Sequence, residues 1–305
     1  MENTSIHKKT FLSFTVGELV AGVLLACLCM LALWIENKIV SPREEVQLVK
    51  SFPYDVVLAD GALQAQSAII YDLTDGRVLF AKNSEIQLPL ASLTKLMTAD
   101  VALDMNSASN TVAVSVKAVS TEGESGIKRG SIWRLGDLLK YALTVSSNDA
   151  MAAVAESGGD ALFITQMNDK ANSLGLAQSY FLDPTGLDST NSVSGGYGSA
   201  LDVAKLAGDI YMQHPDIFES TVQDGATYSG TDNIVRGEPT AAPILDIPGL
   251  IGAKTGYTNL AGGNLVVVFD ISIGHPVVVV VLHSTQDGRF EDVRNLISEA
   301  RAAHK

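Results

Sequence analysis

The sequence predicts a mixed α/β (α+β) fold, in which strands from both ends of the domain form one sheet and the helices between them form a separate lobe. Two β-like runs flank a turn in residues 66–81. Two long apolar runs in residues 264–284 have the composition of central strands. The residues between these regions show mainly helical periodicity. With 305 residues, 47% of them hydrophobic, the chain can bury a substantial core.

The first predicted element is a hairpin, in which the turn LTDG joins QSAIIYD to RVLFA. Apolar residues then recur at helical spacing in five segments. The last of these begins with a typical N-terminal cap, Ser199 followed by Asp202. The predicted helices are residues 92–103, 135–145, 148–156, 164–174 and 199–211.

The periodicity changes towards the end of the chain. NLVVVFDI and VVVVVLHS, residues 264–271 and 277–284, are joined around Gly274 and predict two central strands of the sheet. FEDVRNLISEARAAHK, residues 290–305, predicts a closing amphipathic helix. The sheet is therefore assembled from segments that are far apart in the sequence.

The N-terminal region predicts a membrane anchor. Residues 19–35, LVAGVLLACLCMLALWI, carry no charge, and as a helix they would be about 25 Å long, near the lower limit for crossing a bilayer. Lys8 and Lys9 precede them, so the positive-inside rule keeps the N-terminus in the cytoplasm and exports the remainder. A cleaved signal peptide is the alternative, but no A-x-A site follows the apolar run. We expect a single-pass protein of the bacterial cell membrane, with its main domain on the extracytoplasmic side.

This interpretation divides the chain into three parts. Residues 1–40 form the cytoplasmic tail and anchor, residues 41–60 form a charged linker with two prolines, and residues 61–305 form the exported domain. Both cysteines, Cys27 and Cys29, lie in the anchor, so disulfides do not stabilise the exported domain.

Charge and motif content exclude several classes of function. The net charge is −13 and the basic residues form no cluster, which argues against nucleic-acid binding. The five histidines show no H-E-x-x-H spacing, so we expect no metal and no cofactor. There is also no G-x-S-x-G motif for a serine hydrolase of that kind.

One motif predicts nucleophilic chemistry at the start of an apolar helix. In ASLTKLMTAD, Ser92 and Lys95 are three residues apart and share one face of the helix. A lysine buried among apolar side chains has a lowered pKa, so its neutral amine can take the proton of a serine hydroxyl. The same spacing occurs at Ser5 and Ser125, but neither begins an apolar helix. The alternative is a helix cap beside a lysine that reaches solvent.

Two further motifs follow in order. Ser146-Ser147-Asn148 lies between two predicted helices, and Lys254-Thr255-Gly256 lies on an apolar segment before the strand pair. A strand there would present a cation and a hydroxyl at one edge, and Gly256 would let a ligand backbone lie close. A second S-x-N match, Ser189-Thr190-Asn191, lies in a Gly- and Ser-rich loop, and we interpret it as chance. The order S-x-x-K, S-x-N, K-T-G is the pattern of penicillin-binding proteins and class A β-lactamases.

The resemblance extends beyond these motifs. PLASLTKLMTA, LTVSSNDA, MNDKANSLGL, DPTGL and GAKTGYTNLAGGNLV resemble the D-alanyl-D-alanine carboxypeptidases, the low-molecular-mass penicillin-binding proteins. The similarity runs from about Gly61 to Ile297. It implies the β-lactamase/transpeptidase-like fold, an antiparallel sheet with helices on both faces and an inserted helical lobe, with the active site between sheet and lobe.

The resemblance also implies a reaction. Ser92 would attack the carbonyl that joins two terminal D-alanines of a peptidoglycan stem peptide, while Lys95 takes the hydroxyl proton. Ser146 would relay a proton towards the leaving amine, and Asn148 would hold the substrate amide or Lys95. β-Lactam antibiotics would inhibit by acylating the same serine.

The remaining site residues follow from the same resemblance. Backbone N–H groups of Ser92 and Tyr257 would form the oxyanion hole. Lys254, Thr255 and Arg289 would bind the free carboxylate of the substrate, since guanidinium suits bidentate carboxylate binding. The alternative for Arg289 is a solvated charge at a strand end. Likewise, the Ser125-Gly126 segment would either line the cleft or form a plain turn.

Three alternative functions stay open. A class A β-lactamase needs a glutamate in an E-x-x-L-N context, and the glutamates between the second and third motifs, Glu156, Glu219 and Glu238, lack it. A D,D-endopeptidase that cuts peptidoglycan cross-links would use the same residues. A catalytically silent penicillin-binding sensor would be expected to have lost some motif residues, and all are present here.

Overall fold

The computed structural model describes residues 30, 56, 58, 61–123 and 125–304. The chain divides into two units, Met1–Pro53 and Tyr54–Lys305, and all described residues except Met30 belong to the second. The predicted anchor, residues 19–35, lies outside the described residues apart from Met30. Among the residues that are described, no helix combines the length and apolar character needed to cross a bilayer.

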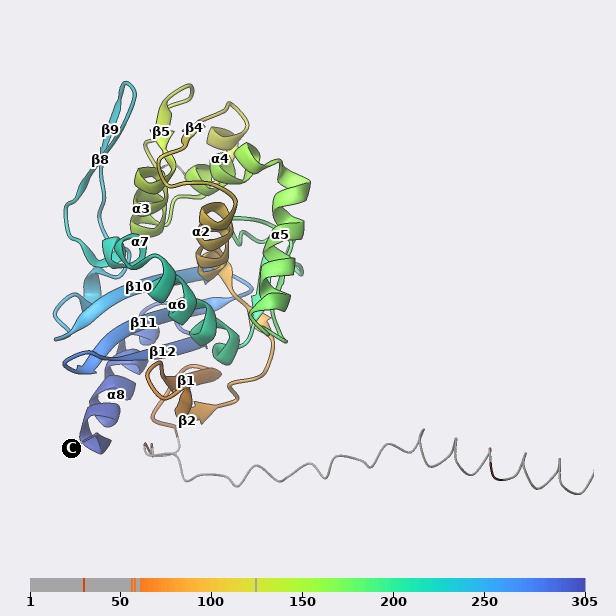
Figure 1. Ribbon diagram of the computed structural model, residues 1–305. Helices are drawn as coiled ribbons and strands as arrows, with labels where there is room; N and C mark the ends of the chain where they lie inside the picture. The colour runs from red at the N-terminus through yellow and green to blue at the C-terminus, as the bar shows by residue number, and fades with distance from the viewer. Residues whose placement is uncertain (1–29, 31–55, 57, 59–60, 124, 305) are drawn as a thin grey trace, which may run out of the picture. The chain divides into compact units, whose positions relative to one another are not determined.

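Five antiparallel strands form the main sheet, in the order β10-β11-β12-β1-β2 (Figure 1). Strand β1 pairs with β12, so that Ile69 lies opposite Val280, and it pairs with β2 on its other side. The predicted hairpin and the predicted strand pair thus lie side by side in one sheet. The strands are β1 (Ser67–Asp72), β2 (Arg77–Lys82), β10 (Leu250–Thr258), β11 (Gly262–Ser272) and β12 (His275–Ser284).

Both faces of the sheet are buried, which explains why the central positions of β11 and β12, residues 265–269 and 277–282, are all apolar. Val266 and Val268 belong to the core on one face, and Val267 and Phe269 to the core on the other, because side chains alternate along a strand. Helix α8 (Gly288–Ala303) packs on the second face. Helix α6 (Ala200–Gln213) packs on the first face (Figure 1).

The helices between β2 and β10 form the predicted lobe, in which α3, α4 and α5 surround α2 (Figure 1). The cap of α6 is as predicted, since the Asp202 N–H donates to Ser199 Oγ. Helix α5 begins at Asp160, four residues before the predicted start, because Gly159 at φ +82° separates it from α4. The helices are α2 (Thr94–Met105), α3 (Leu135–Val145), α4 (Asn148–Gly158), α5 (Asp160–Ser173), α6 (Ala200–Gln213) and α7 (Pro215–Glu219).

Several short strands had no counterpart in the sequence prediction. With two to four residues each, they are too short to show a period of two. They pair as β4 with β5, β8 with β9, and β3 with β7 with β6. The strands are β3 (Leu88–Pro89), β4 (Thr111–Ala113), β5 (Ile132–Arg134), β6 (Tyr180–Phe181), β7 (Gly196–Gly198), β8 (Thr227–Gly230) and β9 (Asn233–Arg236).

Candidate active site

Ser92 lies in a strained turn at the junction of the lobe and the sheet. It belongs to a short 3₁₀ helix, Ala91–Leu93, that leads directly into α2. Ala91 has φ +50°, a left-handed conformation that costs a non-glycine residue about 1–3 kcal/mol. Such strain persists only where neighbours fix the backbone, and here Asn264 Nδ2 donates to the Leu90 carbonyl at 3.1 Å. The turn that carries the serine is therefore held from the sheet as well as from its own helix.

Two glycines make room for this turn. A Cβ on Gly186 would lie 2.0 Å from the Ala91 carbonyl oxygen, so any side chain there would displace the turn. A Cβ on Gly256, in the K-T-G motif, would lie 2.8 Å from the Leu90 oxygen and 3.2 Å from the Ser92 nitrogen. Strand β10 thus passes close to the Ser92 backbone, and the next residue along it is Tyr257. This approach brings together the two residues whose N–H groups are the predicted oxyanion hole.

Lys95 is completely buried on the first turn of α2, and its amine has three neighbours. Its Nζ lies 2.8 Å from Ser92 Oγ, 2.6 Å from Asn148 Oδ1 and 2.6 Å from the Thr185 carbonyl oxygen. The amide and carbonyl oxygens can only accept hydrogen bonds. A neutral amine has two N–H groups, which these oxygens bind, and one lone pair, which then faces the serine hydroxyl. The contacts therefore orient Lys95 as a base towards Ser92.

Burial also adjusts the charge of this amine. Desolvation lowers the pKa of Lys95 from 10.5 to about 7, and the carboxylates of Asp183 and Asp149 offset part of that decrease. A base works best when its pKa is close to the working pH. The alternative from the sequence, a helix cap with a lysine that reaches solvent, is wrong.

The pKa of Lys95 predicts how acylation of Ser92 depends on pH. Only the neutral amine can accept the hydroxyl proton, and its fraction increases with pH. We expect the rate of acylation by a fluorescent penicillin to rise about tenfold per pH unit below pH 7 and to level off above it. Stopped-flow measurements between pH 5 and 9 test this, and a rate that stays constant through pH 7 would contradict it.

A second amine and a second serine lie across the site. Helix α3 ends at Val145, and Ser146 follows in a left-handed conformation with φ +62°. Lys254 on β10 is fully buried, and its Nζ donates to Ser146 Oγ at 2.8 Å and to the Thr255 carbonyl at 2.7 Å. Burial, together with the nearby charges of Lys95 and Arg289, lowers the pKa of Lys254 well below its usual value. The lysine and the serine therefore form a pair that can pass a proton.

Asn148 and Ser147 of the S-x-N segment have different roles, and Ser125 from a preceding loop supports the same region. Asn148 Nδ2 donates to the Glu122 carbonyl at 2.7 Å, which turns Oδ1 towards Lys95. Ser147 caps α4 by accepting from the Ala150 N–H. Ser125 donates to Asp149 Oδ1 at 2.6 Å and accepts from Ser147, so it supports the start of α4.

Thr255 and Tyr257 continue β10 beyond Lys254. Thr255 Oγ1 donates to Thr240 Oγ1 at 2.7 Å and is almost fully buried. Tyr257 is about half exposed and lines a groove of about 840 Å³. The groove is bounded by residues 187–191, residues 257–260 and Glu122, and none of these described lining residues is basic.

Arg289 lies behind the K-T-G strand. It is buried, and its Nη1 donates to the Gly256 carbonyl at 2.8 Å. Its Nε is buried, and no residue that the structure describes accepts a hydrogen bond from it. The alternative from the sequence, a solvated charge, is therefore wrong. One nitrogen holds the strand, and the remaining N–H groups of the guanidinium can bind an anion.

The sequence interpretation assigned no role to the loop Asp183-Pro184-Thr185-Gly186. DPTGL counted only towards the resemblance, yet the Thr185 carbonyl is one of three groups on Lys95 Nζ and Gly186 accommodates the Ala91 turn. A backbone carbonyl has no sequence signature, so only the glycine could have indicated this contact.

A possible metal-binding group lies further along α2. Asp100, Asp104 and His214 have ligand atoms within 4.8 Å of one another. Lys170 Nζ lies 3.1 Å from Asp100 and 2.8 Å from Asp104. This ammonium already neutralises part of the acidic group, and we assign no ion to it.

The sequence of this chain is similar to those of known D-alanyl-D-alanine peptidases. The sequence profile of the D-alanyl-D-alanine carboxypeptidase family matches residues 55–286. The chain is 35% identical over 213 residues to the D-alanyl-D-alanine carboxypeptidase DacF of Bacillus subtilis, covering 66% of this chain and 52% of DacF. It is 31% identical to a D-alanyl-D-alanine endopeptidase of Pseudomonas aeruginosa, covering 72% of this chain and 71% of that protein.

The structure of this chain is also similar to that of a solved penicillin-binding protein. Penicillin-binding protein D2 of Listeria monocytogenes, crystallised in the ampicillin-bound form, superposes with a TM-score of 0.66 at 28% identity. The superposition covers 80% of this chain and 98% of that one. The chain spans about half the length of DacF but nearly all of the Listeria structure.

Proposed function

This chain belongs to the D-alanyl-D-alanine carboxypeptidase family, and from that membership and the site geometry we propose that it is a serine-type D-Ala-D-Ala carboxypeptidase. It would remove the terminal D-alanine from peptidoglycan stem peptides through an acyl-enzyme on Ser92. The observation that carries this proposal is the buried Lys95 amine, 2.8 Å from Ser92 Oγ and bound on its other sides by two oxygens.

Acylation uses the two lysine–serine pairs in turn. Lys95 accepts the Ser92 proton as Oγ forms a bond to the carbonyl carbon of the penultimate D-alanine. Backbone N–H groups of Ser92 and Tyr257 then stabilise the oxyanion, by about 3 kcal/mol each. The Ser146–Lys254 pair donates a proton to the leaving amine as the C–N bond breaks. The proton held by Lys95 then passes to the Ser146–Lys254 pair, which leaves Lys95 neutral again. In the second half-reaction Lys95 accepts a proton from the attacking water and returns it to Ser92 Oγ as the acyl group leaves.

Binding of the substrate carboxylate distinguishes a carboxypeptidase. The Thr255 hydroxyl lies on β10, the strand along which the substrate would bind, and the Arg289 guanidinium lies behind that strand. An incoming carboxylate would raise the pKa of Lys254 and favour its ammonium form. The substrate would thereby supply the charge that lets Lys254 act as an acid.

The same machinery predicts the response to β-lactams. Penicillin should acylate Ser92, and the adduct should hydrolyse slowly, because none of the three glutamates considered above is among the described hydrogen-bond partners of Lys95. Glu156 accepts from Ser115, Glu238 pairs with Arg236, and Glu219 is exposed on α7. Mass spectrometry after mixing should show a persistent adduct on the Ser92 peptide. Rapid, repeated turnover of penicillin by the purified protein would instead indicate a β-lactamase.

D,D-endopeptidase activity is the second candidate, because a relative of that name matches 72% of the chain. The deciding experiment offers the purified protein a D-Ala-D-Ala pentapeptide and a cross-linked muropeptide side by side. A carboxypeptidase releases free D-alanine from the first. Cleavage of the second alone would favour the endopeptidase, and cleavage of neither, with penicillin still bound, would favour a sensor.

We further propose that residues 19–35 anchor the protein in the bacterial cell membrane, with the enzyme outside the cytoplasm. The support is the uncharged run preceded by Lys8 and Lys9. Protease added to intact spheroplasts should digest the main domain. Without protease, the full-length protein should be recovered in the membrane fraction. Full protection of the domain, or recovery in the soluble fraction, would overturn this topology.

A further inference from the structure

The carboxylate of Asp183 organises the loop that reaches Lys95. Its Oδ1 accepts from the Thr185 N–H at 2.7 Å, from the Gly186 N–H at 3.0 Å and from the Thr185 hydroxyl. The Thr185 hydroxyl in turn accepts from the Leu187 N–H at 3.1 Å. Asp183 Oδ1 therefore fixes the backbone of Thr185 and Gly186 directly, and that of Leu187 through the Thr185 hydroxyl.

Contacts with α2 and with the Ala91 turn fix the other side of the loop. Thr98 on α2 donates to the Pro184 carbonyl at 2.6 Å, and Gly186 packs against the Ala91 turn. The Thr185 carbonyl consequently faces the Lys95 amine at 2.6 Å. Asp183 thus controls, through two residues, one of the acceptors that aim the lysine lone pair at Ser92.

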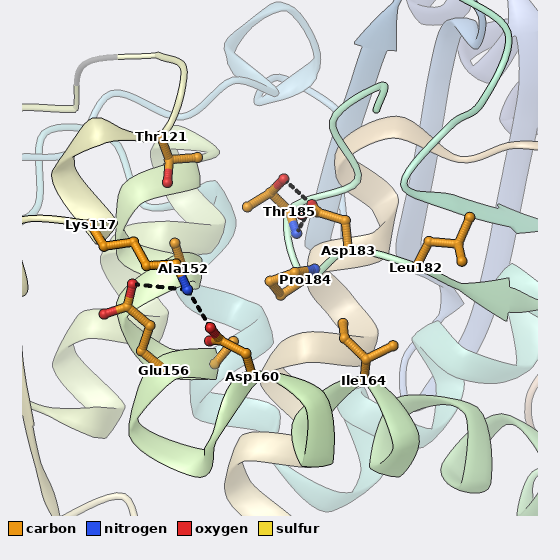
Figure 2. A pocket seen from close by; sticks show the side chains of 11 residues that line it. Lys117, Thr121, Ala152, Glu156, Asp160, Ile164, Leu182, Asp183, Pro184 and Thr185 are labelled. Carbon is orange, nitrogen blue, oxygen red and sulfur yellow. Dashed lines mark hydrogen bonds and ion pairs between the residues drawn. The ribbon is translucent and has the colours of Figure 1, made fainter. Parts of the chain in front are cut away.

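Beyond the loop lies a cavity of about 270 Å³, lined by Asp183 and Thr185 together with residues of α4 and α5 (Figure 2). Its charged residues are Lys117, Glu156, Asp160 and Asp183 (Figure 2). The Lys117 amine pairs with Asp160 and lies 3.9 Å from Glu156. Lys117 is thus paired with Asp160 and Glu156, whereas the carboxylate of Asp183 makes its hydrogen bonds within the loop.

Resting on the proposed function, we propose that Asp183 is a positioning residue for the base Lys95. It shapes the Asp183–Gly186 turn so that the Thr185 carbonyl holds the amine, and it contributes a negative charge beside that amine. Nothing in the resemblance assigned either role to this residue.

The two roles can be separated by chemistry. All three donors bind Oδ1, so Asp183→Asn can keep the turn while removing the charge. Asp183→Ala removes both. The charged groups that face Lys95 are Asp183 from the loop, Asp149 from α4 and Lys254 from β10. Since Asp183 raises the pKa of Lys95 against the effect of burial, losing its charge must lower that pKa.

The test measures acylation of the whole chain by a fluorescent penicillin as a function of pH, together with thermal stability. For Asp183→Asn we expect a plateau close to that of the unmodified chain and an acid limb displaced to lower pH. For Asp183→Ala we expect the plateau to fall about 100-fold, as for a misplaced catalytic group. The matched control is Asp160→Asn, an acid of the same cavity whose carboxylate pairs with Lys117, and its profile should not move.

An unshifted acid limb for Asp183→Asn would overturn the proposal, even if Asp183→Ala loses both stability and acylation. Such a result would mean that the residue is merely structural. An equal shift for Asp160→Asn would also overturn it, because the effect would then be one of general charge. Failure of the proposed function has a different readout, since the unmodified chain would then release no D-alanine while still being acylated by penicillin.

Discussion

Ser92→Ala is expected to abolish release of D-alanine from a D-Ala-D-Ala peptide and to abolish covalent labelling by penicillin. Removing the nucleophile of a serine hydrolase typically slows kcat by about 10⁶-fold. The serine contributes little to the fold, because its side-chain hydrogen bond among the described residues is with Lys95, and alanine is smaller. We therefore expect an inactive protein with an unchanged melting temperature, measured by D-alanine release and thermal unfolding.

The matched control is Ser173→Ala. Ser173 is exposed at the end of α5, and its hydroxyl donates to the Lys170 carbonyl of the same helix. This variant should retain full activity. Comparable D-alanine release by Ser92→Ala and the unmodified chain would reject Ser92 as the nucleophile.

Lys95→Met has the second largest expected effect. Methionine fills much of the buried volume but offers no base, so the Ser92 hydroxyl has no proton acceptor at 2.8 Å. General base catalysis contributes about 10²–10⁴-fold, and we expect acylation by penicillin to slow by about 10³-fold or more. In addition, the acid limb at pH 7 should disappear from what rate remains, because the group that titrates there is gone.

Lys205→Met provides the comparison for this variant. Lys205 is partly exposed on α6, and within the described part of the chain its amine makes one long contact, 3.4 Å from the Gly175 carbonyl. Its substitution should leave both the rate and the pH profile unchanged. Acylation of Lys95→Met at the normal rate, with the normal pH dependence, would show that another group acts as the base.

The residue types and spacing of the three motifs predict which side chains make up the candidate site. Ser92 and Lys95 are one helical turn apart, so their contact is local and follows from helix geometry. Lys254 and Ser146 are 108 residues apart, and their 2.8 Å contact depends on how the lobe docks on the sheet. The resemblance supplied that docking, since no periodicity in the chain could.

Some features had no basis in the sequence. The left-handed conformations of Ala91 and Ser146 are imposed on residues that do not favour them. The role of the Thr185 carbonyl cannot be predicted from residue type, because every residue has a backbone carbonyl. Arg289 stays a predicted site residue, and its bond to the Gly256 carbonyl depends on the packing of α8 against β11 and β12.

The sequence by itself determined the long helices and the strands of the main sheet, because helix and strand periods record which face of each segment is buried. It also determined the reactive groups, since a hydroxyl or an amine belongs to its residue type. Only the tertiary structure decided that Lys95 is a base. That property requires removal of water from the amine and two fixed oxygens from α4 and the Asp183–Gly186 loop, and these conditions exist only once distant segments have packed together.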